Sequence, residues 1–152
     1  MPTLTPQLRK ILARTRLAIL PEDYYMVRLP VDVKPIPGEW YRPATTRFGV
    51  FVRESDAITL IVPRRKWLRM QLLFDKYTVS KPMKVITFDV KLSLNVVGFI
   101  AAIGAVLAKE QISILPVSSF DRDHILVMKD QLPHAVKALR KFLQGAGKTR
   151  GR

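Results

Sequence analysis

The 152-residue sequence contains no cysteine, so it can form neither a disulfide framework nor a zinc site built on thiolates. Its seven glycines never form the GxGxxG or GxxxxGK[ST] patterns that bind phosphate groups. The longest apolar stretch, residues 96–108, is shorter than the roughly 18 residues that a membrane-spanning helix needs. We therefore predict no disulfide, no metal, no cofactor and no membrane span.

Catalytic patterns are also scarce. His124 and His134 are the two histidines, too few for a convincing metal site. His124 follows Asp123 directly, but neighbouring residues of a strand point to opposite faces, and no nucleophile elbow accompanies them. The sequence predicts a protein that is not an enzyme and has no catalytic residues, with 48% hydrophobic residues to form its core.

Acidic residues are few and unevenly placed: 12 Asp and Glu stand against 26 Lys and Arg, for a net charge of +14. Three segments hold 14 basic residues and no acid, while the remainder of the chain is neutral. The basic residues of these segments are Arg9, Lys10, Arg14 and Arg16; Arg64, Arg65, Lys66 and Arg69; and Lys137, Arg140, Lys141, Lys148, Arg150 and Arg152. Concentrated charge suits docking on a polyanion such as RNA, DNA or an anionic membrane, and a solvated surface is the alternative.

The N-terminal residues 1–20 have the pattern of a basic amphipathic helix. Thr5 is placed to cap it, Pro6 suits its first position, and Leu8, Ile11 and Leu12 share one stripe. An acid-free, Arg-rich start of this kind is typical of a mitochondrial targeting segment, and equally of a docking helix in the mature protein. The expected location is therefore mitochondrial, or otherwise cytoplasmic.

Residues 21–81 have the pattern of strands and one short helix. We expect a strand over residues 24–29, a hairpin of residues 48–53 and 57–62, and a helix after Pro63. Trp67, Met70 and Leu73 are expected to pack that helix on the sheet. Trp67, among arginines, either stacks on a nucleic-acid base or anchors the core.

Residues 82–145 have a clearer pattern, followed by a basic tail over residues 146–152. Strands are expected over residues 83–91, 112–117 and 124–128, and a helix over 97–110. A closing helix is capped by Asp130 and ends at Gly145. The order strand, helix, strand, strand, helix is that of a ferredoxin-like fold without its fourth strand. We expect the N-terminal half to supply that strand or to pack edge to edge.

The segments ITFDV and SLNVVGFIAAIGAVLAKEQISILPVSSFDRDHILV, with the closing helix, resemble the ACT domain, in particular the second module of a prokaryotic tandem-ACT family of unassigned function. PEDYYMVRLP and FGVFVRESDAITLIVP are similar to that family's first module, and the animal cytosolic arginine sensor is a more distant relative. The resemblance implies an α+β fold of tandem ACT-like (ferredoxin-like βαββα) modules sharing antiparallel sheets, with an added N-terminal helix. It also implies no catalysis and, often, an amino acid held at a module interface.

A retained ligand site would lie at a strand-to-helix turn, whose backbone N–H groups suit a carboxylate. The candidates on this turn are Asn95, Val96, Val97 and Gly98. Across the interface, the family's strand-turn motif falls on Ser118, Ser119, Phe120, Asp121 and Asp123, where an acid could meet an amino group. The alternative is structural: Gly98 serves the turn, Asn95 caps the helix, and the two aspartates shape the hairpin.

Two functions of different classes follow. In the first, which we favour from the sequence, an ACT fold has become an assembly module whose basic segments dock on RNA within a ribonucleoprotein such as a mitochondrial ribosome. In the second, the chain is an amino-acid-binding regulatory sensor. Its expected partners are RNA or proteins of a larger assembly in the first case, and an amino acid in the second, with a homo-oligomer as one form that a free chain could take.

Overall fold

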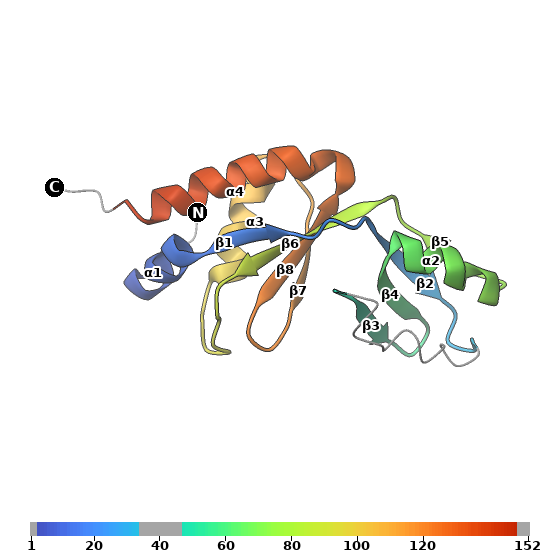
Figure 1. Ribbon diagram of the computed structural model, residues 1–152. Coiled ribbons are helices and arrows are strands. Elements are labelled where there is room, and N and C mark those ends of the chain that lie inside the picture. Colours follow the sequence, from blue (N-terminus) through green and yellow to red (C-terminus); the bar gives the residue numbers. More distant parts are fainter. Residues whose placement is uncertain (1–2, 34–46, 149–152) are drawn as a thin grey trace. The chain divides into compact units, whose positions relative to one another are not determined.

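Figure 1 shows a computed structural model of the chain, which describes residues 3–33 and 47–148. The chain divides into two compact units. Unit 1 combines Met1–Ile19 with Val85–Arg152, and unit 2 is Leu20–Lys84. Residues from the two ends of the chain therefore fold together, with unit 2 inserted between them in sequence.

Unit 1 is built on a sheet with the strand order β1-β6-β8-β7. Its strands are β1 (Arg16–Ile19), β6 (Met83–Asp89), β7 (Leu115–Ser118) and β8 (Asp123–Met128). Its helices are α1 (Pro6–Arg14), α3 (Phe99–Lys109) and α4 (Leu132–Ala146), the last preceded by the 3-10 turn η4 (Lys129–Gln131). The strand β1 runs antiparallel to β6, with Leu17 opposite Phe88. It completes the four-stranded sheet, which confirms that the N-terminal half supplies the missing strand.

The prediction of one helix over residues 1–20 was wrong in its second half. As expected, the Thr5 hydroxyl accepts a hydrogen bond from the Leu8 amide (3.2 Å) and α1 starts at Pro6. The helix ends at Arg14, because Thr15 adopts an extended conformation and Arg16–Ile19 pairs with β6. Hydrogen bonding to β6 satisfies this backbone as well as a longer helix would, and tertiary context decides between the two.

The core of unit 1 joins all three helices to the sheet. Leu8 and Leu12 of α1 are buried in one cluster with Phe88, Phe99 and Leu139. Phe88 and Phe99 meet edge to face with ring centroids 5.4 Å apart. The helix α4 contacts both α1 and α3 (Figure 1), so it is the central helix of the unit.

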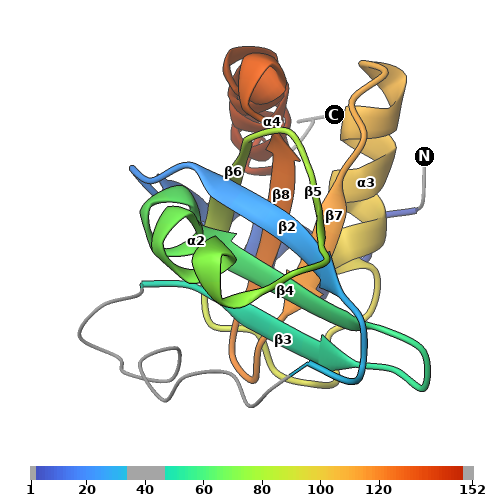
Figure 2. The same ribbon diagram turned by 90° about the vertical axis from the view of Figure 1, so that its right-hand side faces the viewer.

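Unit 2 is a smaller sheet with the order β3-β4-β2-β5. Its strands are β2 (Tyr24–Leu29), β3 (Val50–Arg53), β4 (Ile58–Pro63) and β5 (Thr78–Val79). The helix α2 (Arg64–Met70) continues into the 3-10 turn η3 (Gln71–Leu73) and packs against β2 and β4 (Figure 2). The strands β2, β3 and β4 were predicted, whereas the two-residue β5 was not.

Trp67 is the centre of the core of unit 2, with 1% of its surface exposed. Its ring stacks on Phe74, with centroids 5.9 Å apart, and meets Tyr77 edge to face at 5.0 Å. The core-anchor interpretation of Trp67 is therefore right, because a buried ring cannot stack on a base. Met70 is buried as expected, but Leu73 is 59% exposed, since the chain tightens into η3 after Met70.

Several element boundaries in unit 1 differ from the sequence prediction: β6 ends at Asp89 rather than residue 91, and α3 starts at Phe99 rather than residue 97. The strand expected from residue 112 begins at Leu115, because α3 ends in a tight turn in which Gln111 has a φ of 57° and the Ile112 amide bonds to the Leu107 carbonyl. Asp130 lies within η4 and does not cap α4, whose first turn contains Pro133. Gly145 lies inside α4, which continues to Ala146. Within the described residues, no helix is long and apolar enough to cross a membrane.

Candidate functional site

A pocket of about 340 Å³ lies in unit 1 where the chain enters α3. The segment that follows β6 forms one side, and the turn between β7 and β8 forms the other. The backbone amide of Leu92 donates to the carbonyl of Asp121 (2.7 Å), which ties the two sides together. The lining residues are Leu92, Ser93, Leu94, Val96, Gly98, Phe99, Ile100, Ala101, Ser118, Ser119, Phe120, Arg122 and Asp123.

The first turn of α3, which lines this pocket, has backbone donors without acceptors in the helix. Gly98 has a φ of 87°, a left-handed conformation that favours glycine, and it starts the helix without a side-chain cap. The first bond of the helix runs from the Ala102 amide to the Gly98 carbonyl (2.9 Å). The amides of Phe99, Ile100 and Ala101 therefore have no acceptor within the helix. Such amides, at the positive end of the helix dipole, suit a carboxylate or another anion.

A carboxylate lies on the opposite side of the pocket. Asp123, at the start of β8, is only 9% exposed, and its Oδ1 accepts a hydrogen bond from the Ser118 hydroxyl (2.6 Å). The hydroxyl and the amide of Ser119 both donate to the Arg122 carbonyl, each at 2.9 Å. These bonds hold the turn in one conformation. The pocket is thus lined by the first turn of α3 on one side and by a hydrogen-bonded acid on the other.

His124, next to the pocket, is a satisfied strand residue. Its Nδ1 lies 2.9 Å from the Thr87 hydroxyl on β6. Burial, followed by the charge of Arg122, lowers the pKa of His124, and the charge of Asp123 opposes this shift. The imidazole is therefore held in its neutral form at neutral pH.

The structure brings together six of the nine ligand-site residues that the sequence predicted. These lining residues are Val96, Gly98, Ser118, Ser119, Phe120 and Asp123. Asn95, Val97 and Asp121 do not line the pocket. Asn95 does not cap α3 either, because the N-cap is Gly98, three residues later. The Asn95 amide donates to the Ser93 hydroxyl (3.3 Å). That these residues bind a ligand stays a prediction.

Sequence reasoning missed the remaining lining residues. Phe99, Ile100 and Ala101 form the first turn of α3, and an anion site at a helix start necessarily includes that turn. The signal was therefore present in the sequence. Leu92, Ser93 and Leu94 offered no such signal, because their position depends on the bond between Leu92 and Asp121 across the fold.

The predicted basic residues fall into separate groups on the two units. In unit 1 they lie on α1, β1 and α4 and beyond, as Arg9, Lys10, Arg14, Arg16, Lys137, Arg140, Lys141 and Lys148, and all are exposed. In unit 2, Arg64, Arg65 and Arg69 of α2 are exposed, and Lys66 is half-buried. Arg150 and Arg152 lie outside the described residues. Among the described residues, no group of three or more His, Asp or Glu side chains could hold a metal ion.

Comparison with known proteins supports the fold assignment. Residues 78–141 match the family model of the ACT domain. A protein from Agrobacterium tumefaciens superposes with a TM-score of 0.68 at 23% identity, covering 86% of this chain and 90% of the other. A protein of unknown function from Vibrio cholerae gives a TM-score of 0.67 at 24% identity, covering 91% and 97%. The regulatory subunit of aspartate kinase from Thermus thermophilus gives 0.60 at 11% identity, covering 88% and 99%. No curated protein matches the sequence.

Proposed function

The chain carries an ACT domain in residues 78–141, and from that premise we propose that it is a non-catalytic regulatory protein that binds a free amino acid in the pocket at the start of α3. The observation that carries this proposal is the pairing of opposite charges across one small pocket. The amides of Phe99, Ile100 and Ala101 face the carboxylate of the amino acid, and Asp123 faces its ammonium group.

The size and lining of the pocket support a small ligand with an apolar side chain. Its volume of about 340 Å³ is near the lower end of the range of roughly 300–1,000 Å³ for ligand sites. Leu92, Val96 and Phe99 supply apolar walls between the two polar sides. An aliphatic or aromatic amino acid therefore matches the lining better than a charged one.

Exposed apolar side chains beside the pocket support self-association. Leu94, Val97 and Phe120 are 75%, 85% and 78% exposed, an unusual concentration of large apolar residues. A second copy of this chain, packed over this edge, would cover them and close the pocket. We propose that the ligand stabilises such a homo-oligomer.

For the pocket we propose the regulatory function, which the sequence left as the alternative, in place of assembly within a mitochondrial ribosome. The similar structure from Thermus thermophilus is a regulatory subunit of aspartate kinase, and none of the three similar structures described above is named as a ribosomal or RNA-binding protein. Because these three structures are less than 25% identical to this chain, their similarity supports the fold alone. The ACT match and the geometry of the pocket therefore carry the choice.

The test is thermal unfolding of the purified chain with each of the twenty amino acids. A ligand at a hundred times its dissociation constant adds about 2.7 kcal/mol to the unfolding free energy and raises the Tm. We expect the largest shift from an apolar amino acid. The absence of any shift at 10 mM ligand would count against the proposal.

A matched pair of variants on α3 locates the site. Ala101→Leu places a larger side chain in the pocket, whereas Ala108→Leu makes the same change at an exposed position on the same helix away from it. Ala101→Leu should abolish the thermal shift, and Ala108→Leu should retain it. Equal shifts in the two variants would place the ligand elsewhere.

A further inference from the structure

A second surface of unit 1, formed by its helices, carries charge of one sign. The helices α1, α3 and α4 contain seven Lys and Arg residues and no Asp or Glu. These residues are Arg9, Lys10, Arg14, Lys109, Lys137, Arg140 and Lys141. All seven are exposed, and we call them together the helical basic surface.

The nearby acids are fewer than the seven cations of this surface. Glu110, directly after α3, lies 2.7 Å from the Nε2 of His134, and Asp89 lies 3.7 Å from Arg122. No cation of the helical basic surface forms a salt bridge with an acid in the described part of the chain. The surface therefore keeps a positive potential that can attract an anionic partner.

The three helices meet around a hollow of about 450 Å³, to which each contributes one cation. These cations are Arg9 from α1, Lys109 from α3 and Lys141 from α4. The floor includes the apolar Val106 and Phe142. Glu110 also lines the hollow, so three cations and one acid leave a net charge of +2, which suits an anionic phosphate group.

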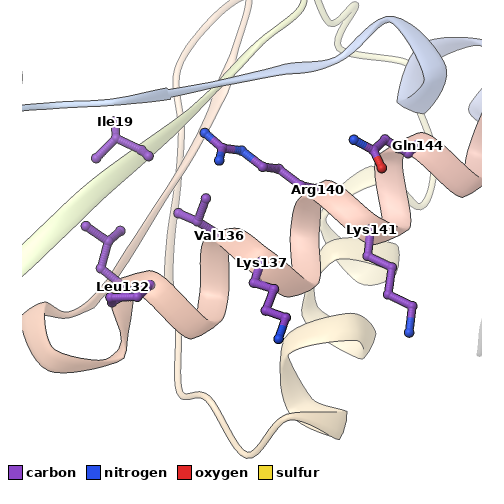
Figure 3. Close-up of a pocket in the computed structure, with 8 residues that line it drawn as sticks. Ile19, Leu132, Val136, Lys137, Arg140, Lys141 and Gln144 are labelled. Carbon is purple, nitrogen blue, oxygen red and sulfur yellow. The ribbon is translucent and has the colours of Figure 1, made fainter.

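The charge continues beyond this hollow along both flanks of α4. Figure 3 shows the pocket on one flank, where Arg140 points to the same side as Val136, while Lys137 and Lys141 project to the other side of the helix. At a rise of about 1.5 Å per residue, the 15 residues of α4 span about 22 Å. This length exceeds a single phosphorylated metabolite and fits several consecutive phosphates of a polymer.

We propose that the helical basic surface docks on the phosphate backbone of a nucleic acid, with one phosphate held among Arg9, Lys109 and Lys141. A membrane fits less well, since none of the exposed large apolar residues described lies on α1, α3 or α4 to insert into lipid. The surface also presents no exposed aromatic ring for stacking on bases. Binding is therefore independent of base sequence and is driven by counterion release.

The experiment is fluorescence anisotropy of the full chain with labelled 20-nucleotide RNA, as poly-U and as a mixed sequence, between 50 and 300 mM salt. The test variant is Arg9→Gln, Lys109→Gln, Lys141→Gln. The matched control is Arg64→Gln, Arg65→Gln, Arg69→Gln on α2, which removes the same charge from exposed positions of unit 2. Both variants should unfold at the Tm of the wild type, because all six side chains are exposed.

We expect both RNAs to bind with similar affinity. The test variant should bind at least tenfold more weakly at 50 mM salt, and the slope of log K against log salt should fall by about 0.7, because its three side chains hold one phosphate. The control should retain the wild-type slope. The pair Lys10→Gln, Lys137→Gln, outside the hollow, should lower the slope by about 1.4, because these two side chains contact two separate phosphates.

Three results would overturn the proposal: no binding at 50 mM salt, an equal loss in test and control variants, or tighter binding to vesicles with 30% phosphatidylserine than to RNA. Thermal unfolding of the test variant with amino acids tests the regulatory proposal independently of the nucleic-acid proposal. Because the two sites share no residue, the test variant should retain that shift.

Discussion

Units 1 and 2 have the same sheet plan but different core size and surface charge. In unit 1 the central strand β6 pairs with β1, and in unit 2 the central strand β2 pairs with β5. In both cases the neighbour comes from a separate part of the sequence. Unit 1 has a core cluster of sixteen buried residues, covered by three helices. In the described part of unit 2, the core cluster has seven buried residues and is covered by one short helix. The comparison teaches that the sheet plan alone does not create a site. The candidate pocket and the helical basic surface both depend on the helices of unit 1.

The largest expected effect is the loss of a core side chain that ties the N-terminus to unit 1. Leu12→Ala, at a fully buried position of α1, should lower the unfolding free energy of unit 1 by about 2–5 kcal/mol. Trp67 reports on unit 2, and unit 1 contains no tryptophan. Urea unfolding should therefore be followed by tryptophan fluorescence and by hydrogen exchange of α4.

The matched variant Leu60→Ala removes a fully buried leucine from β4 of unit 2. If the units unfold independently, Leu12→Ala shifts only the exchange of α4, and Leu60→Ala shifts only the fluorescence. Coincident shifts in both probes would instead show one cooperative unit.

A smaller effect is expected at the turn that unit 1 uses for its pocket. Gly98→Ala should cost about 1–2 kcal/mol, because the residue has a φ of 87° and an added Cβ would lie 3.3 Å from the Cδ2 of Leu8. Thermal unfolding measures the loss. In the control Gly104→Ala, the Cβ meets Ile114 at an ordinary 3.8 Å, so this helix-interior change should be neutral or stabilising by up to about 1 kcal/mol. Equal destabilisation by both variants would contradict the role of the backbone conformation.

Unit 2 contains a buried polar group whose removal should raise the stability of the unit. Within the described residues, the Tyr24 hydroxyl is buried and has no hydrogen-bond partner, and burial, then the charge of Glu22, raises the pKa of Tyr24. Tyr24→Phe should stabilise unit 2 by about 1 kcal/mol, because it removes a hydroxyl whose desolvation is uncompensated. The fluorescence of Trp67 in urea provides the measurement. Destabilisation would show that the hydroxyl does have a partner in solution.

The smallest expected effect is a difference in acid sensitivity. In unfolded unit 1, His124 takes up a proton near pH 6.5, whereas the lowered pKa in the folded state resists it. Its contribution to stability is therefore present above pH 6.5 and is lost as the pH falls through the folded-state pKa. His124→Asn should make the unfolding free energy of unit 1 less dependent on pH between 7 and 5. An unchanged dependence would exclude His124 as its source.

The elements of the second half were predictable because their apolar periodicities are strong. The helices α3 and α4 and the strands β6, β7 and β8 were all predicted, with boundaries wrong by a few residues. The strand β7 begins later than predicted, because the chain makes a turn at Gln111 after α3 ends. Gln111 has a left-handed conformation, and no glycine in the sequence signals this turn. Six of the nine predicted pocket residues line one pocket, since a strand-to-helix turn and a hairpin motif are local features.

The N-terminal segment shows where local pattern failed. Its helical stripe predicted α1, but the same pattern could not show that Arg16–Ile19 pairs with β6, seventy residues away. Leu8 and Leu12 are buried in the core of unit 1, so α1 is part of the folded unit. The mitochondrial location stays a prediction.

The sequence by itself determined the type of fold, the excess of basic residues and the absence of any cysteine chemistry, because periodicity, charge and composition are properties of the chain. Only the tertiary structure decided that β1 completes the sheet, that Asp123 and the first turn of α3 line one pocket, and that Arg9, Lys109 and Lys141 share one hollow. These facts join residues far apart in the chain. Their proximity is set by the burial of side chains such as Leu8, Leu12 and Leu139 in one core, which no local pattern encodes.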